Sequence, residues 1–426
     1  MRGMKDSGIE WIGEIPNDWE VKKIASVYKE RTEKVSDKDY EPLSVTKKGV
    51  VPQLENAAKT TNGDNRKLVK KGDFAINSRS DRRGSCGISP LDGSVSLIMT
   101  VLKPRNNMDN KYYNYVFRSE RFSDEFYKWG HGIVDDLWST KWEDMKRIFI
   151  PFPNKEEQEL ISDYLDEKVQ EIDNIISKTH KTIEEYKKYK QSVITEAVTK
   201  GLNPNVEMKD SEIEWIGEIP KDWILTITKH TYNVTLGKMI CNEPKDDSYT
   251  YENYLCSQNI KWEGIQTSDI KKMWFSKNEK ERYLLQYGDI LVTEGGSIGV
   301  SSVYKNEFYP CYIQNAVHKV SGKKNSLNKF FYYWMTLVES CGYLDLICNK
   351  ATIAHYTKEK LQNTPILKVP LKEQAGIVNY LDKKCTEIDN LITKKQELIT
   401  QLETYKKSLI YECVTGKKEV ALSYAY

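Results

Sequence analysis

Two long stretches of this chain carry the same helical pattern, and they constrain the fold more than any other feature. From Asn154 to Gly201, apolar residues recur at steps of four and three, the heptad spacing of a helix with one apolar seam. The seam residues are Ile161, Leu165, Val169, Ile172, Ile176, Ile183 and Tyr186, with Thr179 inside the series. From Lys372 to Gly416 the series returns as Ile377, Leu381, Cys385, Ile388, Ile392, Ile399 and Leu402, with Lys395 in the place of Thr179.

Start and stop signals bound both helices. Asn154, with Glu157 three residues later, predicts an N-cap, while Gly201 and Gly416 predict left-handed residues that end each helix. About 42 residues make a rod of roughly 60 Å. A rod with one apolar stripe needs a cover of matching length, so we expect the two helices to form an antiparallel coiled coil. The expected interface residues are Ile161, Leu165, Ile172, Ile176, Ile377, Leu381, Ile388 and Ile392.

A second duplication precedes the helices. The sequence MKDSGIEWIGEIPNDW begins at Met4 and returns from Met208 as MKDSEIEWIGEIPKDW. The chain is therefore an internal repeat of one unit, a globular domain followed by a rod. We expect a first domain over 1–150, a central helix over 151–203, a second domain over 204–368 and a C-terminal helix over 369–426. Because the repeat starts at Met4, residues 1–3 are expected to be an upstream or vector-derived extension.

Within each domain the same landmarks recur. A Gly-Asp turn precedes a short apolar strand at Gly72 and again at Gly288. A further strand is expected over 94–102 and over 311–320, followed by an aromatic helix over 111–117 and over 328–335. This alternation predicts an α+β fold with two mixed α/β domains related by a pseudo-two-fold repeat. Between landmarks the copies diverge, which favours one scaffold with two different recognition surfaces over loop drift without purpose.

Composition narrows the function classes. Charged residues make up 30% of the chain and the mean hydropathy is -0.64, and no apolar run is long enough to span a membrane. The start of the chain lacks an apolar signal segment, so we expect a cytoplasmic protein. The eight cysteines are scattered singly and form no C-x-x-C pair, which argues against a disulfide framework or a zinc ribbon. The net charge of +2 is modest for a nucleic-acid binder, although Glu and Lys on the two rods dilute any local excess.

Catalytic motifs are missing from the sequence. It contains no G-x-x-x-x-G-K-[ST] phosphate loop, no H-E-x-x-H, no G-x-S-x-G and no Asn/Asp-Pro-Pro-aromatic tetrapeptide of amino-methyltransferases. The five histidines do not form clusters with carboxylates or cysteines at the spacing of metal ligands. We therefore predict no catalytic residue and no metal ligand in this chain.

A binding chemistry remains. After the first Gly-Asp strand, arginines alternate with small polar residues, a composition that can grip phosphates and guanine edges. The candidate DNA-binding residues of the first domain are Arg66, Lys67, Arg79, Ser80, Arg82 and Arg83. In the second domain the equivalent loop carries Glu294, whose carboxylate could accept from a cytosine amino group. The candidates there are Lys238, Asn259, Lys261, Ser297, Gln314 and Asn315. For any single residue, a solvated loop is the alternative.

These features together resemble the specificity (S) subunit of Type I restriction-modification systems. The resemblance rests on the duplicated MKDSGIEWIGEIPxxW lead-in, the Gly-Asp-Phe and Gly-Asp-Ile strands, and the helical runs KEEQELISDYLDEKVQEIDNII and KEQAGIVNYLDKKCTEIDNLI. It covers nearly the whole chain. It implies a non-catalytic, sequence-specific DNA-binding subunit with two target-recognition domains, each for one half of a split target, spaced by the helical pair.

The resemblance also implies partners. They are double-stranded DNA, two methyltransferase (M) subunits that use S-adenosylmethionine to methylate adenine N6, and two restriction (R) subunits that use ATP and Mg. We expect no cofactor in this chain itself and no association with a membrane. Two rival functions stay open on the residues alone: a scaffold whose domains bind peptide or glycan, and a self-contained modification enzyme with an unrecognised active site.

Overall fold

The computed structural model describes residues 2–55, 63–79, 82–133, 138–348 and 354–420. It divides into two compact units, one made of Met1–His180 with Gln396–Tyr426 and the other of Lys181–Lys395. We call them unit 1 and unit 2. Each contains one globular part and one half of each long helix.

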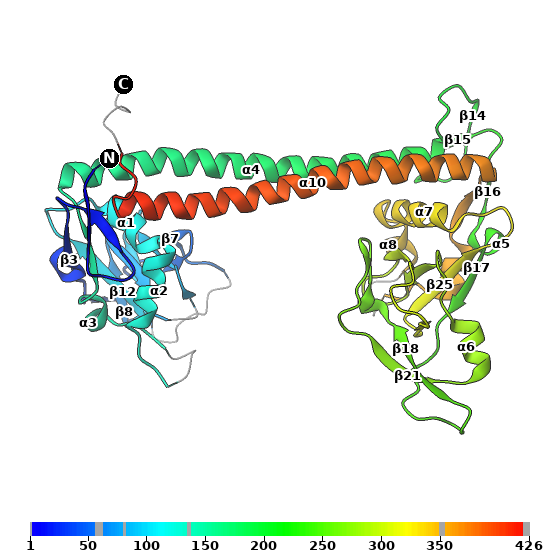
Figure 1. Cartoon of the computed structure of the whole chain (residues 1–426), viewed down its shortest axis with the longest axis horizontal. Helices are drawn as coiled ribbons and strands as arrows, with labels where there is room; N and C mark the ends of the chain where they lie inside the picture. The colour runs from blue at the N-terminus through cyan, green and yellow to red at the C-terminus, as the bar shows by residue number, and fades with distance from the viewer. Residues whose placement is uncertain (1, 56–62, 80–81, 134–137, 349–353, 421–426) are drawn as a thin grey trace. The chain divides into compact units, whose positions relative to one another are not determined.

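The two long helices are α4, Lys155–Lys200, and α10, Leu371–Val414 (Figure 1). The predicted caps are confirmed. The Asn154 side-chain oxygen accepts a hydrogen bond from the backbone N–H of Glu157 at 2.9 Å. Gly201 and Gly416 adopt φ values of 75° and 72°, a conformation that costs other residues steric strain.

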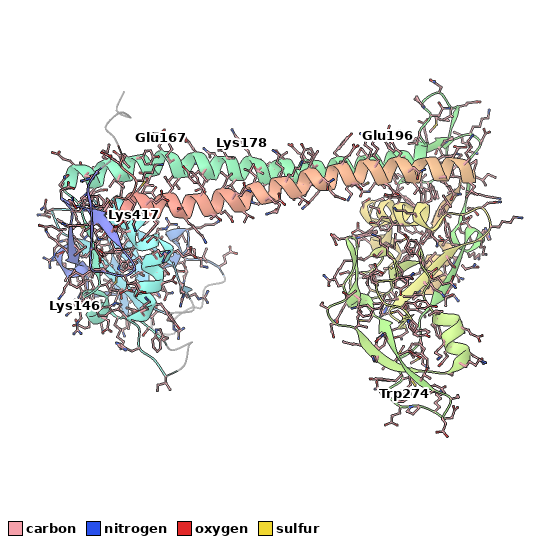
Figure 2. All side chains as sticks on the ribbon, viewed as in Figure 1. Lys146, Glu167, Lys178, Glu196, Trp274 and Lys417 are labelled. Atoms are coloured by element: carbon pink, nitrogen blue, oxygen red, sulfur yellow. The ribbon has the colours of Figure 1, made fainter. Side chains whose placement is uncertain are left out.

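The helices pair in opposite directions. In unit 2, Lys190 of α4 contacts Asp389 of α10 at 2.7 Å, and in unit 1, Lys406 of α10 contacts Asp173 of α4 at 2.6 Å. The later part of each helix therefore meets the earlier part of the other, which confirms the antiparallel coiled coil. Charged side chains such as Glu167 and Glu196 line exposed positions of α4 (Figure 2).

The eight expected interface residues form the core of the apolar seam. Six of the eight are buried and Ile176 and Ile392 are half-buried. Since exposed ion pairs contribute about 0–1 kcal/mol each, burial of this seam holds the helices together more than their ion pairs do.

Unit 1 is built around a four-stranded sheet of order β10-β9-β12-β4. Its strands are β4 Tyr28–Glu30, β9 Phe74–Asn77, β10 Cys86–Ile88 and β12 Met99–Pro104. A second sheet joins β11 Gly93–Val95, β8 Arg66–Val69 and β5 Lys34–Val35, and paired strands add β1 Met4–Asp6, β2 Glu14–Pro16, β3 Glu20–Lys23, β6 Leu43–Thr46, β7 Gly49–Pro52 and β13 Phe149–Phe152. The helices are α1 Asn110–Arg118, α2 Glu120–Lys128 and α3 Trp142–Met145.

Unit 2 repeats this plan with a four-stranded sheet of order β17-β25-β22-β23. Its strands are β17 Tyr232–Leu236, β22 Ile290–Thr293, β23 Ser301–Val303 and β25 Val317–Gly322. Further strands are β14 Met208–Asp210, β15 Glu218–Pro220, β16 Ile224–Ile227, β18 Thr250–Leu255, β19 Ile260–Lys261, β20 Gly264–Ile265, β21 Lys271–Phe275, β24 Tyr312–Ile313 and β26 Pro365–Lys368. The helices are α5 Thr228–Thr231, α6 Lys277–Tyr283, α7 Asn328–Ser340, α8 Tyr343–Ile347 and α9 Lys358–Asn363.

Each lead-in packs on the start of a long helix. The buried indoles of Trp19 and Trp223 donate to Glu157 and Glu373 at 2.8 and 3.0 Å. A buried indole N–H needs such an acceptor, so these tryptophans fix the lead-in to the helix. Trp11 is also buried and Trp215 packs against the core of unit 2, so all four lead-in tryptophans serve packing. Arg2, in the expected extension, donates to Asp18 at 3.1 Å.

One buried glutamine connects each domain to the long helix that follows it. The Gln158 side-chain oxygen accepts from the backbone N–H of Asp109 at 2.8 Å, and the Gln374 oxygen accepts from that of Leu327 at 2.8 Å. Both glutamines are buried, and each also donates to a backbone carbonyl before its own helix. Because a buried amide group must keep its hydrogen bonds, these contacts fix the orientation of each domain on its helix.

The structure corrects the expected strands over 94–102 and 311–320. Each segment forms two strands separated by a turn, closed by a bond from Met99 N–H to the Ser96 carbonyl at 3.0 Å and from Val317 N–H to the Gln314 carbonyl at 2.9 Å. The apolar pattern runs through both turns and so hides them. The Gly-Asp turns are as predicted, with Gly72 and Gly288 both at φ 88°.

Candidate nucleic-acid interface

Three segments of unit 1 converge where its two central strands meet. Strand β9 ends at Asn77, opposite Met99 at the start of β12. Beyond Asn77 the chain continues into Ser78 and Arg79, beside the turn at 96–98. A third segment joins them, because Thr140 N–H donates to the Ser78 carbonyl at 2.9 Å and Arg79 forms an antiparallel bridge with Ser139. We call this convergence of three segments site 1.

Unit 2 holds the equivalent convergence, which we call site 2. Strand β22 ends at Thr293, opposite Val317 of β25. Beyond it come Glu294 and Gly295, beside the turn at 314–316. The third segment is joined by a bond from Tyr356 N–H to the Glu294 carbonyl at 2.8 Å. The register therefore makes Glu294 the counterpart of Ser78, and Gly295 the counterpart of Arg79.

Site 1 opens on a groove of about 510 Å³. Its lining includes Lys67, Arg79, Leu97, Ile98, Lys141 and Trp142. Leu97 and Ile98 are 41% and 42% exposed, which is unusual for aliphatic residues in adjacent positions. Sequence reasoning missed these two residues and Lys141, because the turn that presents Leu97 and Ile98 was read as strand and Lys141 comes from a distant segment.

Two of the predicted basic residues of unit 1 are bonded within the unit, and one of them lies in its interior. Arg66 is only 4% exposed, and its guanidinium donates to the Ser94 hydroxyl and carbonyl at 2.8 and 3.0 Å. The Lys67 ammonium donates to Glu30 at 3.1 Å and to the Met99 carbonyl at 2.8 Å. A buried charge must be paired, so the structure assigns Arg66 to the interior rather than to a DNA-facing surface.

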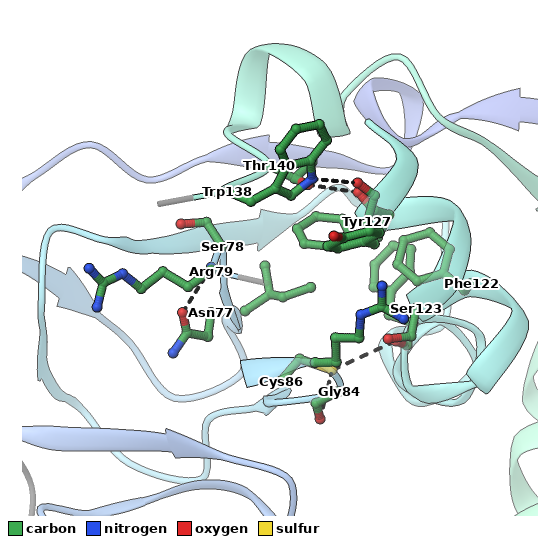
Figure 3. Close-up of a pocket in the computed structure, with 14 residues that line it drawn as sticks. Asn77, Ser78, Arg79, Gly84, Cys86, Phe122, Ser123, Tyr127, Trp138 and Thr140 are labelled. Carbon is green, nitrogen blue, oxygen red and sulfur yellow. Dashed lines mark hydrogen bonds between the residues drawn. The ribbon is translucent and has the colours of Figure 1, made fainter. Parts of the chain in front are cut away.

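Arg83 is exposed but engaged. Its guanidinium lies 3.8 Å from the centre of the Tyr127 ring and 3.1 Å from the Asp124 carboxylate. The aromatic residues Phe122, Tyr127 and Trp138, labelled in Figure 3, form a cluster that lines a small cavity together with Arg83. The cavity within the cluster is about 20 Å³, enough for one water molecule and too small for a nucleobase. The cluster therefore packs against Arg83 and does not form a pocket for a base.

Two predicted residues of this loop remain. Arg82 is exposed. Ser80 lies outside the described residues.

Two predicted residues of unit 2 are also structural. Lys238, 7% exposed, forms an ion pair with Glu279. Asn259, 5% exposed, accepts from Cys256 N–H at 2.9 Å and donates to the Gln266 and Asp269 carbonyls at 3.0 and 3.1 Å. These two residues are corrected from candidate DNA contacts to parts of the interior, because their polar groups are used to hold loops.

The remaining predictions for unit 2 lie at or near the surface. Ser297 is exposed, and Lys261, Gln314 and Asn315 are half-buried. Gln314 and Asn315 belong to the turn of site 2, where the Gln314 side-chain oxygen accepts from Ala316 N–H at 3.1 Å. By the same register, Asn315 is the counterpart of Leu97 and Gln314 is the counterpart of Ser96, so both amides belong to the turn that presents Leu97 and Ile98 in unit 1.

A buried histidine lies under site 2. His318 is fully buried, its Nε2 lies 2.8 Å from the Tyr356 carbonyl, and the same atom lies 3.7 Å from the Glu294 carboxylate. Burial lowers the pKa of His318 to about 4, so the imidazole is neutral near pH 7. Burial also raises the pKa of Glu294, while the nearby His355 opposes that rise.

Acidification is expected to destabilise unit 2 through His318. An unfolded histidine has a pKa of about 6.5, so on acidification the unfolded chain takes up this proton first. The free energy of unfolding should fall between about pH 6.5 and pH 4, by about 3 kcal/mol at most from this group. Denaturant unfolding across this range should show a shallower pH slope for His318→Gln than for the unchanged chain.

The exposed His180 provides the control, since His180→Gln should keep the original slope. The raised pKa of Glu294 acts in the opposite direction and is present in all three proteins. Equal slopes for His318→Gln and the unchanged chain would show that His318 titrates normally.

Within the described ranges, no group of three or more His, Cys, Asp or Glu side chains is arranged to hold a metal ion. Among the helices of the same ranges, none has the length and apolar character needed to cross a membrane.

Comparisons with known proteins agree with this architecture. The MjaVIII type I restriction enzyme specificity subunit of Methanocaldococcus jannaschii is 26% identical in an alignment 419 positions long that covers 88% of this chain and 87% of that protein. A chain solved in work on complex assembly and conformational transition of the type I R-M system superposes with a TM-score of 0.73 at 15% identity, over 95% of this chain and 99% of that one.

The crystal structure of the HsdS subunit from Thermoanaerobacter tengcongensis gives a TM-score of 0.54 at 16% identity, over 95% of this chain and 98% of that one. These two likenesses establish the fold. The model of the type I restriction modification DNA specificity domain matches residues 16–185 and, again, residues 240–403. With two matched copies that together span most of its length, the chain belongs to the family of type I restriction-modification specificity subunits.

Proposed function

We propose that unit 1 and unit 2 each read one half of a bipartite double-stranded DNA target. The observation that carries this proposal is the pair of equivalent sites with unlike side chains. Site 1 presents Arg79, Leu97 and Ile98, whereas site 2 presents Glu294 and the amides of Gln314 and Asn315. One scaffold with two different sets of donors and acceptors is suited to two different base sequences.

In this proposal α4 and α10 set the number of unread base pairs between the halves and dock two M subunits. The M subunits bind S-adenosylmethionine and methylate adenine N6, while two R subunits supply cleavage with ATP and Mg. This chain contributes specificity and no catalysis. Its net charge of +2 supports weak binding by the chain alone, because DNA affinity grows with the number of phosphates neutralised.

Selection from random duplexes tests this function. The complex of this chain with its M subunit is expected to enrich two fixed blocks of bases separated by a block of constant length and random sequence. Competitor DNA and near-physiological salt suppress binding through phosphates alone. A single uninterrupted block, or no enrichment by a well-formed complex, would contradict the proposal.

A further inference from the structure

Arg79 is held in place by its backbone on two sides. Its N–H donates to the Asn77 side-chain oxygen at 3.1 Å, and its bridge with Ser139 pairs it to the third segment of site 1. The turn beside it is tied to the same place, because the Ser78 hydroxyl donates to the Ile98 carbonyl. A side chain projected from such a fixed position can select one geometry of a bound group.

The Arg79 side chain is exposed, and its guanidinium has no hydrogen bond or ion pair with any residue in the described part of the chain. Its donors are therefore open to a bound group. Neighbouring cations differ in this respect. The Lys67 ammonium is bonded to Glu30 and to a carbonyl, and the Arg83 guanidinium is paired with Asp124. Figure 3 shows the Arg79 side chain extending away from the aromatic cluster that seats Arg83.

The surroundings of Arg79 fit the edge of a base better than a phosphate. Leu97 and Ile98 line the same groove and expose apolar surface. The methyl group of thymine packs favourably on apolar side chains, whereas a hydrated phosphate gains nothing from them. Guanine presents two acceptors, O6 and N7, to the planar fork of an arginine. Arg79 therefore has both the donor pattern and the environment for guanine in the major groove.

We propose that Arg79 is the residue with which unit 1 selects a guanine in its half of the target, with Leu97 and Ile98 against a neighbouring thymine methyl. This inference rests on the proposed function, since it assigns a base to one half-site. The counterpart of Arg79 in unit 2 is Gly295, which has no side chain to make this contact. The selection is thus confined to one half.

Mapping of methylated adenines with Arg79→Ala tests the assignment. The variant is co-expressed with the M subunit, and the methylated fraction is measured at every genomic site that differs from the parent motif by one base. One guanine in one half-site is expected to become degenerate, with a loss of discrimination of about 5- to 150-fold, the range for a bidentate arginine contact. The other half-site should stay unchanged.

Lys141→Ala is the matched control, because Lys141 is an exposed cation in the same groove. It should lower binding to all sites alike and reduce the salt slope by about one, with no change of motif. Arg79→Lys should keep part of the discrimination, since lysine lacks the fork. Thermal unfolding should be the same for Arg79→Ala and the parent.

The outcomes separate the two claims. A split motif whose bases are unchanged in Arg79→Ala, with methylation lowered uniformly, would make Arg79 a phosphate contact and overturn this assignment while leaving the proposed function intact. Absence of a split motif in the parent complex would overturn both.

Discussion

Replacing Trp223 with alanine is expected to lower the free energy of unfolding of unit 2 by about 3–5 kcal/mol, the range for removal of a buried large aromatic side chain. Trp223 is 1% exposed and belongs to the core of unit 2. It lies against Gly201, where an added Cβ would be 3.2 Å from the indole, and its N–H donates to Glu373 at 3.0 Å. The substitution would therefore leave a cavity and remove a hydrogen bond at the junction of the lead-in with both long helices.

Denaturant unfolding monitored by far-ultraviolet circular dichroism measures this effect. Trp274→Ala is the matched control, because Trp274 is a half-buried residue on β21, away from the two long helices (Figure 2). Its loss should cost clearly less, in keeping with its partial burial. A cost for Trp223→Ala no larger than that for Trp274→Ala would show that the lead-in does not stabilise the unit.

A heptad inserted into each long helix is expected to lengthen the unread spacer by about three base pairs, because seven residues add about 10.5 Å of helix and each base pair occupies about 3.4 Å. The insertions belong after His180 in α4 and after Lys395 in α10, where both helices pass from one unit to the other. A seven-residue step keeps the apolar seam in register. Insertion at 193–198 would instead disrupt the core of unit 2, which contains four buried residues of that segment.

Binding of the variant complex to duplexes with stepwise longer spacers measures the change. Both half-site sequences should stay the same, and the original spacing should no longer be bound. The control is the same heptad in α4 alone, which breaks the match between the helices and should impair binding at every spacing. Retention of the original spacing by the doubly extended variant would exclude the helices as the determinant of the spacer.

The sequence predicted the repeated architecture because the signals are local. Heptad steps, Asn154, Gly201 and the Gly-Asp turns each act through neighbouring residues, and the structure has them as expected. The pairing of the two helices was predicted because two matched apolar seams can cover each other, and its antiparallel direction because each helix adjoins a globular domain on the same side.

The site was predicted less well because burial depends on distant partners. Nothing near Arg66 in the sequence shows that Ser94 takes its guanidinium, and nothing near Lys238 shows that Glu279 pairs with it. Arg79 could be named as a candidate because it follows a recognisable strand, and its contact with DNA stays a prediction. Leu97, Ile98 and Lys141 were missed because a turn inside an apolar run and a segment some 40 residues later in the chain complete the groove.

The most direct test of the central claim is to co-express this chain with an M subunit that forms a complex with it and to map modified adenines in the host DNA by single-molecule sequencing. Two half-site readers on a common scaffold predict a new split motif, with one modified adenine in each half, on opposite strands. A well-formed complex that yields no new modification, or one that modifies an uninterrupted motif, would contradict the account.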